Sequence, residues 1–379
     1  MASKALKREK RARLGKMDIT FLSFVLILLT TGLVMLFSAS YVYSLEYYDN
    51  SYHFISRQAI FGLAGVGIML VVSRIDYHIW RKFAWVFFGI IILILFILLI
   101  IPPMVQNMDV KRWLVIGPIN FQPSELAKFA IILLFSSLIA ANYKQMKSIG
   151  FIALLVAILG ITCVLIVLEP HLSATVLVFS IGMVLLIVGG LPKIYMVIGG
   201  IATAVGGVIF ALSGAISYVS DRLAYWIDPW SDATGKGFQT IQSLLAIGSG
   251  NILGRGIGQS RQKHLWVPEP HNDFIFSIVC EELGLIGAVI IVLLFCLLIW
   301  RGFTIAMHAP DKFGSLLALG LTFQVGLQAM LNIWVVTNTI PNTGISLPFF
   351  SYGGTSLLIL LAEMGIVLSV SRGSGLDGG

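Results

Sequence analysis

Charged residues are scarce in this sequence. Asp, Glu, Lys and Arg make up 11% of its 379 residues, where an ordinary soluble domain has about 25%. Hydrophobic residues make up 58%. A soluble helical fold would need polar faces along its long apolar helices, and those faces are missing. The scarcity of charge therefore excludes a soluble protein and predicts an integral membrane protein.

Cysteine is also rare, and the familiar nucleotide motifs are missing. Cys163, Cys280 and Cys296 all fall in apolar runs, with no CxxC pair and no histidine at metal-ligand spacing. We therefore expect them to pack as small residues and exclude a disulfide framework. The glycine-rich stretch at 248–258 fits neither the Walker A nor the Rossmann spacing, which argues against nucleotide binding.

Long apolar runs, in contrast, are abundant. A bilayer core needs roughly 20 apolar residues per helix, and lipid-exposed backbone must bond within the helix, so these runs predict an all-α fold of about ten transmembrane helices. The predicted spans are 19–41, 58–73, 83–101, 122–141, 149–167, 171–190, 194–213, 273–300, 314–336 and 350–371. We divide the chain into a basic tail at 1–18, a membrane domain at 19–371 with a large outer loop at 214–272, and a tail at 372–379 that resembles an expression scar.

The positions of Lys and Arg predict the orientation. Of the 25 such residues, sixteen fall on one side of the predicted spans, eight on the other, and Lys128 lies within a span. Because cytoplasmic loops retain cations, both ends of the chain are expected in the cytoplasm. Seven of the cations precede the first span, which is typical of a tail that faces anionic lipid and not of a nucleic-acid site. The first apolar run is too long for a cleavable signal peptide.

The first polar cluster lies at the outer start of the fourth span and comprises Arg112 and the run 122–128. Pro123 suits a first helical turn. Glu125 and Lys128 are three residues apart, so they share one face of the helix and can pair. The pair either neutralises two charges within the membrane or forms the wall of a polar cavity.

The second cluster lies in the outer loop. Its glycine-rich part is followed by the run 259–263, and Arg255, Arg261 and Lys263 stand nearby. Backbone amides and these cations could meet a pyrophosphate head group at the outer interface. The other interpretation is a flexible loop that lies on the membrane.

The third cluster opens the eighth span. Asp273, Ser277 and Glu281 recur every four residues, which predicts one polar helical face that descends from the outer surface. Asp273 could be the N-cap of this helix or a base with a raised pKa, and the two roles can coexist. For Glu281 and Glu282 we favour structural roles, one of them in an ion pair, and for His271 that of a loop residue.

The fourth cluster, at 340–356, contains two prolines and three glycines. Such a composition disfavours continuous helix, and irregular backbone at membrane depth is tolerated only against protein or a wet cavity. The segment therefore predicts a buried cavity open to the outer side, or else close helix packing through small residues.

In this order, the four clusters resemble the SEDS family (shape, elongation, division and sporulation), which includes FtsW, RodA and SpoVE. The likeness covers essentially the whole chain after the basic tail and is most specific at 122–128, 237–258, 268–284 and 341–356. The runs 259–263 and 347–356 are more similar to the division and sporulation branch than to the elongation branch. One departure is His171, where many relatives carry Asp.

The resemblance implies a peptidoglycan glycosyltransferase that polymerises lipid II, the undecaprenyl-pyrophosphate-linked disaccharide-pentapeptide, on the outer face of the bacterial cytoplasmic membrane. The growing chain would be the glycosyl donor. Asp273 matches the family's essential Asp and would act as general base on the acceptor 4-hydroxyl in an inverting transfer. The candidate substrate-binding residues are Arg112, Glu125, Lys128, Arg261, Lys263, Glu269 and Ser351.

The resemblance also implies partners: a class B penicillin-binding protein that crosslinks the new strand, other division membrane proteins and membrane lipids, but no nucleic acid. No cofactor is firmly implied; a divalent cation, Mg²⁺ or Mn²⁺, could assist, although no ligand set is visible. Two other functions stay open, a lipid II flippase and a non-catalytic scaffold. The lack of an internal repeat argues against transport, and a scaffold leaves Asp273 and the interrupted backbone near Pro348 unexplained.

Overall fold

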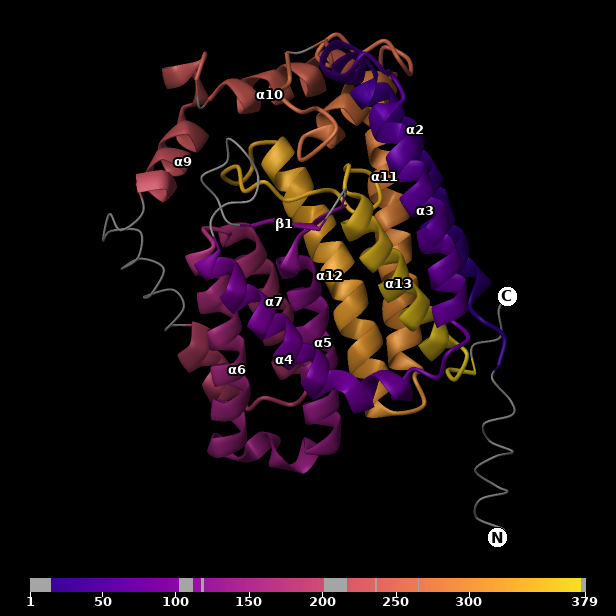
Figure 1. Ribbon diagram of the computed structural model, residues 1–379, viewed down its shortest axis with the longest axis vertical. Helices are drawn as coiled ribbons and strands as arrows, with labels where there is room; N and C mark the ends of the chain where they lie inside the picture. The colour runs from indigo at the N-terminus through magenta and orange to yellow at the C-terminus, as the bar shows by residue number, and fades with distance from the viewer. Residues whose placement is uncertain are drawn as a thin grey trace.

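The protein is a bundle of long apolar helices (Figure 1). The computed structural model describes residues 15–101, 112–116, 119–200, 217–235, 237–264 and 266–375. Within them, 8 helices are long and apolar enough to cross a membrane. These are α2 (Ile19–Tyr48), α3 (His53–Val72), α4 (His78–Ile100), α5 (Pro123–Ala141), α6 (Ile149–Leu168), α11 (Ile275–Met307), α12 (Lys312–Val336) and α13 (Gly354–Ser371).

The sixth predicted span corresponds to α7 (Leu172–Val188), which is apolar but shorter than the others. The seventh, at 194–213, lies only partly in the described residues: the chain is helical over 193–200, and the rest of this span falls outside them. The expected all-α membrane fold is confirmed.

Two helices extend well past their apolar runs. α2 was expected to end at residue 41 but continues to Tyr48, and α11 continues to Met307. The extra turns of α2 are stabilised by aromatic packing, since Tyr43 stacks on Tyr47 and Tyr48 stacks on His53 at the start of α3. Hydropathy marks the part of a helix that lies in lipid, not where the helix ends.

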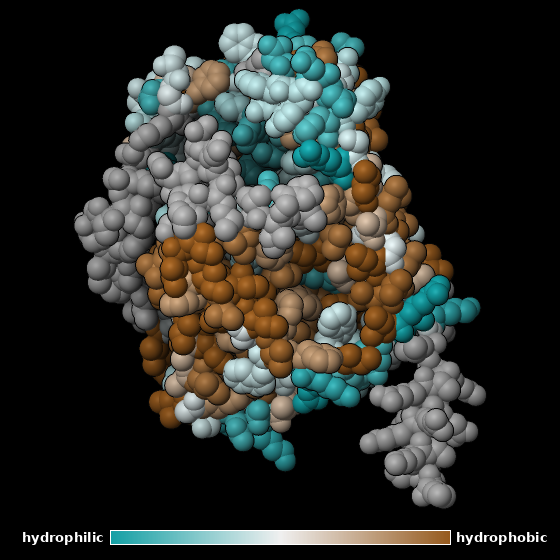
Figure 2. Space-filling view, viewed as in Figure 1, coloured by the Kyte–Doolittle hydropathy of each residue, from teal (hydrophilic) through white to brown (hydrophobic). Residues whose placement is uncertain are grey.

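Polar residues gather above the apolar belt (Figure 2), where Figure 1 places α9 (Ser217–Ile227), α10 (Phe238–Gly250) and the loop that leads to α11. The short 3-10 helix η2 (Pro229–Asp232) joins α9 to α10. The hairpin of β1 (Leu114–Ile116) and β2 (Ile119–Phe121), which the sequence did not predict, precedes α5. At the other end of the bundle, η1 (Tyr143–Lys147) joins α5 to α6.

The two described ends of the chain meet on one side of the bundle. The Gly15 amide donates to the Arg372 carbonyl oxygen at 3.0 Å, and the Asp18 amide donates to Ser371 Oγ at 3.1 Å. Arg301 Nη2 lies 2.8 Å from Asp18 Oδ2 and adds an ion pair from α11. Ends on the same side require an even number of crossings, as the cation distribution predicted.

α11 is broken in its N-terminal part. Gly284 has φ 67° and ψ −169°, so the helical hydrogen bonds are interrupted there. The freed amide of Leu285 donates to Asn251 O at 2.9 Å, and the amide of Arg255 donates to Glu281 O at 3.0 Å. A Cβ at Gly284 would lie 2.2 Å from the amide nitrogen of Gly254, so glycine is required for the loop to approach this closely.

Candidate active site

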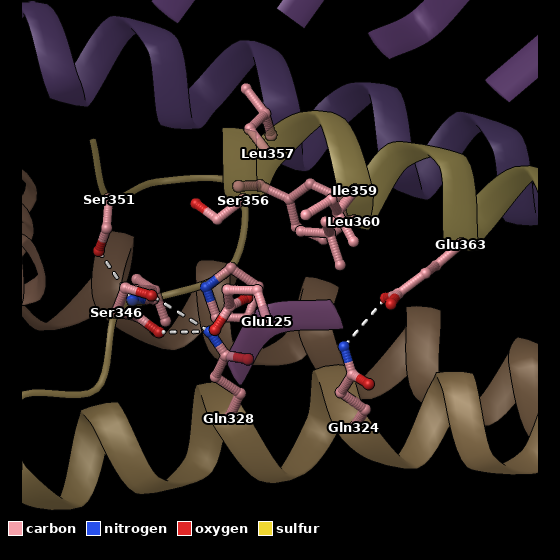
Figure 3. A pocket seen from close by; sticks show the side chains of 13 residues that line it. Glu125, Gln324, Gln328, Ser346, Ser351, Ser356, Leu357, Ile359, Leu360 and Glu363 are labelled. Carbon is pink, nitrogen blue, oxygen red and sulfur yellow. Dashed lines mark hydrogen bonds between the residues drawn. The ribbon is translucent and has the colours of Figure 1, made fainter. Parts of the chain in front are cut away.

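A polar cavity lies between α5, α12, α13 and the irregular segment 337–353 (Figure 3). Its volume is about 400 Å³, including the space at its open mouth. The segment 337–353 is neither helix nor strand, and it lines the cavity with buried residues as the composition of 340–356 predicted. The lining residues are Glu125, Gln324, Gln328, Ser346, Leu347, Pro348, Phe349, Ser351, Ser356, Leu357, Ile359, Leu360 and Glu363.

The predicted pairing of Glu125 with Lys128 is confirmed. Lys128 Nζ lies 2.9 Å from Glu125 Oε1 and donates to Gln328 Oε1 of α12 at 2.8 Å. Lys128 is only 1% exposed, so its charge is held entirely by these partners. Gln328 in turn donates to Ser346 O at 3.1 Å. Glu125 therefore lines the cavity, and its ion pair with Lys128 connects α5, α12 and the irregular segment.

Asp273 lies just outside the helix that it was expected to cap. α11 begins at Ile275, its N-cap residue is Phe274, and no side chain caps it, so the capping interpretation is wrong. Instead, the main-chain oxygen of Asp273 accepts a hydrogen bond from Asn332 Nδ2 at 2.7 Å. The Asn332 side chain thus satisfies the main-chain oxygen of Asp273, which lies just before the helix.

The Asp273 carboxylate is half-buried and accepts no hydrogen bond from the residues that the structure describes. Gly344 lies against it: a Cβ there would stand 3.2 Å from Asp273 Oδ2. Burial and, to a smaller extent, the charge of Glu269 raise the pKa of Asp273, Arg222 and Arg112 oppose the shift, and the net pKa is about 6. The group is thus a carboxylate near neutral pH, but a more basic one than usual.

The two arginines that influence Asp273 are held by main-chain oxygens of other segments. Arg112 donates to the carbonyl of Pro170, and Arg222 of α9 donates to the carbonyl of Asn342. Sequence reasoning included Arg112 as a candidate and omitted Arg222, because α9 lies in a long loop whose path over the bundle cannot be deduced from spacing.

Ser351 and His271 position the backbone beside Asp273. Ser351 Oγ donates to Asn272 O at 2.9 Å, so its hydroxyl is used structurally. The buried ring of His271 packs against Tyr43, Phe54 and Tyr352. Burial lowers the pKa of His271 to about 4, which keeps the ring neutral and agrees with its expected role as a loop residue.

Glu269 lies close enough to Asp273 to raise its pKa, and its own Oε2 accepts a hydrogen bond from Asn272 Nδ2 at 2.9 Å. Its role as a substrate contact stays a prediction. The expected polar helical face is wrong, however, because Asp273 precedes the helix and Ser277 Oγ donates to Phe274 O at 2.7 Å.

The run 259–263 does not offer its amides to solvent. The amides of Arg261 and Gln262 donate to Glu281 at 2.9 Å and 3.2 Å, and Ser260 Oγ donates to the same carboxylate. The amides of this loop therefore bind the Glu281 carboxylate of the protein itself. The expectation that they contact a pyrophosphate head group is wrong. A buried carboxylate needs such donors to remain charged.

Lys263 and Arg261 differ although they are two residues apart. Lys263 is 3% exposed, and its Nζ lies 3.0 Å from Glu282 Oε1 and donates to Ser38 Oγ at 3.2 Å. In this arrangement it has no face toward a ligand, so its expected role in substrate binding is not supported by its position. Arg261 is exposed and stays a candidate.

Three polar residues of α12 went unnoticed in the sequence. Gln324, Gln328 and Asn332 are buried, and they recur every four residues along one helix face. Gln324 donates to Glu363 in the cavity, Gln328 accepts from Lys128, and Asn332 donates to the main-chain oxygen of Asp273. The sequence contains a signal for this arrangement, because side-chain amides every four residues in an apolar helix predict a polar face toward the protein interior.

Glu169 and His171 are both buried in the short turn between α6 and α7. His171 Nδ1 lies 3.2 Å from Ser124 Oγ, and burial lowers the pKa of His171 to about 3. Burial raises the pKa of Glu169 to about 8, opposed by Arg112. Across the described ranges, no group of three or more His, Cys, Asp or Glu could hold a metal ion. The divalent cation stays a prediction without a matching ligand set.

The chain is similar to proteins of one family over nearly its full length. The cell cycle protein model FTSW_RODA_SPOVE matches residues 19–375. Stage V sporulation protein E of Bacillus subtilis is 40% identical over 94% of this chain and 97% of its own length. A probable peptidoglycan glycosyltransferase FtsW of Geobacter metallireducens is 36% identical over 93% of this chain and 94% of its own length.

Solved structures agree with this likeness. A structure described as the structural coordination of polymerization and crosslinking by a peptidoglycan synthase complex matches with a TM-score of 0.79 and 27% identity, and it covers 96% of this chain and 99% of the matched one. The rod shape determining protein RodA of Thermus thermophilus matches with a TM-score of 0.70 and 26% identity over the same shares. The chain therefore belongs to the FtsW, RodA and SpoVE family of multi-pass membrane proteins.

Proposed function

We propose that this protein is a peptidoglycan glycosyltransferase that polymerises lipid II on the outer face of the bacterial cytoplasmic membrane, for cell division or sporulation. Family membership supports the reaction class, since relatives with 34–36% identity carry that name. The observation that carries the mechanism is Asp273, whose carboxylate accepts no hydrogen bond in the described part of the chain and has a pKa raised to about 6.

In the proposed reaction, Asp273 removes the proton from the acceptor sugar's 4-hydroxyl. The hydroxyl oxygen forms a bond to the donor's anomeric carbon, and the bond from that carbon to the lipid pyrophosphate breaks. The pyrophosphate leaves with the electron pair, and the anomeric centre inverts. A single displacement needs one base and no carboxylate nucleophile.

The leaving pyrophosphate needs positive charge, and the arginines near Asp273 supply it. Arg112 and Arg222 both act electrostatically on the Asp273 carboxylate. They approach from different segments, the strand β1 side and α9, so a phosphate group could lie between them. Guanidinium groups suit this task because they present several donors to phosphate oxygens. Glu125 lines the cavity and pairs with Lys128, while Arg261 is exposed and available to a substrate.

The partner is proposed as a class B penicillin-binding protein. The support is the similar structure whose description joins polymerization to crosslinking in one synthase complex. Other division membrane proteins and membrane lipids are expected to contact the protein as well.

The test is polymerisation of labelled lipid II by the purified protein, with and without a class B penicillin-binding protein. We expect glycan strands from the wild type and none from Asp273→Asn. The matched control is Asp49→Asn, which makes the same change at an exposed carboxylate at the end of α2. Equal polymer from Asp273→Asn would reject Asp273 as the base, and lipid movement across vesicles without any polymer would favour a flippase.

A further inference from the structure

A turn of the loop before α11 lies directly beside the kink of that helix. We call residues 251–254, which follow the end of α10, the kink turn. The amide of Leu285 donates to Asn251 O at 2.9 Å, and the amide of Ile286 donates to Ile252 O at 3.2 Å. Backbone segments joined in this way lie at one depth, so the kink turn is level with Leu285 and Ile286.

Leu285 begins the part of α11 that faces away from the protein. All residues from Ile275 to Glu282 are buried, whereas large apolar side chains are exposed beyond the kink at Gly284. The exposed side chains nearest the kink are Leu285, Ile286, Val289, Ile290 and Leu293. In a helix long and apolar enough to cross a membrane, such a face belongs to the surface within the bilayer.

The position of Leu285 along the helix places it inside the membrane core. Arg301, farther along α11, pairs with Asp18 on the side where the described chain ends meet. Leu285 precedes Arg301 by 16 residues, which is a helical rise of about 24 Å. The apolar core of a bilayer is about 30 Å thick, so Leu285 lies within it, close to the surface farther from the chain ends.

The kink turn carries large apolar side chains in place of the polar ones expected of a loop in water. Ile252 is 62% exposed and Leu253 is 80% exposed. Leu285, beside them, is 59% exposed, so the turn extends the apolar surface of α11. Single exposed apolar residues are ordinary, but a continuous patch indicates a surface that an apolar partner covers.

The protein itself satisfies backbone groups in and beside the turn, as a position in the membrane requires. The amide of Gly254 donates to Gly250 O at 2.9 Å, and the amide of Gly256 donates to Glu282 O at 2.9 Å. Irregular backbone is tolerated at membrane depth only where it is held against protein. The kink turn meets this condition, because its hydrogen bonds run to α10 and to both sides of the α11 kink.

We propose that the kink turn inserts into the membrane, in the leaflet farther from the chain ends, so that Ile252 and Leu253 contact lipid acyl chains. The partner is lipid and not another membrane helix, because helix contacts in membranes favour small residues, whereas the exposed side chains here are large. The insertion attaches the loop to the membrane at the point where Glu281 and Glu282 hold the run 259–263.

The test measures whether lipid or water surrounds the turn. The purified full chain, with its three native cysteines changed to alanine, carries one nitroxide spin label on Leu253→Cys in nanodiscs of phosphatidylethanolamine and phosphatidylglycerol. Collisions of the label with O₂, which concentrates in lipid, are compared with collisions with a water-soluble nickel chelate. We expect the ratio of the two to be nearer to that at Leu293→Cys, in the exposed face of α11, than to that at Asp49→Cys, an exposed site at the end of α2.

A ratio at Leu253 equal to that at Asp49 would place the turn in water and overturn the proposal. Low collision rates with both reagents would mean that protein covers the turn, from a second copy or another segment of the chain, and would overturn it as well. If Leu253→Cys does not fold, Ile252→Cys decides, because its side chain is also exposed: nickel collisions as frequent as at Asp49 would reject the insertion.

Discussion

Two acidic sites near the N-terminal end of α11 differ in how their carboxylates are held. The Asp273 carboxylate accepts no hydrogen bond from the described residues. Glu281 accepts bonds from the 259–263 loop and lies 3.5 Å from Arg255 Nε. Glu282 pairs with Lys263 at 3.0 Å and accepts from Ser38. A carboxylate whose bonds are all used stabilises the fold, whereas one without bonds is available to a substrate.

The difference teaches that acidic residues at a regular spacing need not share a function. A period of four placed Asp273 and Glu281 on one helical face, yet α11 begins only at Ile275. Glu281 and Glu282 hold the loop at the kink of the helix, and Asp273 stands before it.

Asp273→Asn should abolish polymerisation while the fold is retained. Loss of a general base costs typically 10²–10⁴-fold in rate. No hydrogen bond to the carboxylate is lost and a buried charge is removed, so Tm should not fall and should rise above about pH 6. The measurements are the polymerisation rate with labelled lipid II and thermal unfolding of the same preparation. A variant that loses activity only because it unfolds would contradict the assignment.

Glu282→Gln should show the opposite pattern. It leaves the buried ammonium of Lys263 without its countercharge, and removing one partner of a buried pair costs about 3–5 kcal/mol. We expect a large fall in Tm, and partial recovery in the double variant Glu282→Gln with Lys263→Met, which removes the orphaned charge. Unfolding curves of the three proteins in one detergent decide it; a single variant as stable as the wild type would reject the structural role.

The pH dependence of polymerisation should follow the Asp273 carboxyl group and not Glu281 or Glu282, whose oxygens are hydrogen-bonded within the protein. With its pKa raised to about 6 by burial, the polymerisation rate should fall about tenfold per pH unit below that value. The sign for stability is opposite to that of most acids. The pKa of Asp273 in the folded protein exceeds its ordinary value of 3.8, so its contribution to stability is fully present below pH 3.8 and is lost as the pH rises through about 6.

Asp273→Asn should remove that step from the plot of unfolding free energy against pH, since an amide does not titrate. Asp49→Asn serves as the control at an exposed site. An acid limb of the rate centred near pH 4, or a stability profile that Asp273→Asn leaves unchanged, would argue against a buried base at this position.

Arg261→Gln should have the smallest effect. Its side chain is exposed, so we expect the unfolding free energy to change by less than about 0.5 kcal/mol. If Arg261 contacts the pyrophosphate, KM for lipid II should rise, most strongly at low ionic strength where charge attraction is least screened. Lys263→Gln is the comparison and should lower Tm. Equal changes in KM and Tm in the two variants would show that the exposed Arg261 and the buried Lys263 do not differ in role.

Much of the fold could be predicted from the sequence because the bilayer imposes local rules. Apolar length predicted the spans, and the ends of the helices were the main error, as for α2. The pairing of Glu125 with Lys128 was also predictable, since residues three apart in a helix are neighbours. The β hairpin before α5 was missed because strands of three residues carry almost no periodic signal.

The sequence by itself determined that the chain is a membrane protein, that its ends lie on one side, and that an irregular segment interrupts the helices at 340–356. Only the tertiary structure decided which charge meets which: that Lys263 belongs to Glu282, that Arg222 approaches Asp273, and that Gln324 meets Glu363. The physical reason is the length of chain on which each property depends. Insertion into lipid depends on short stretches of chain, whereas these partners are brought together by the packing of helices far apart in sequence.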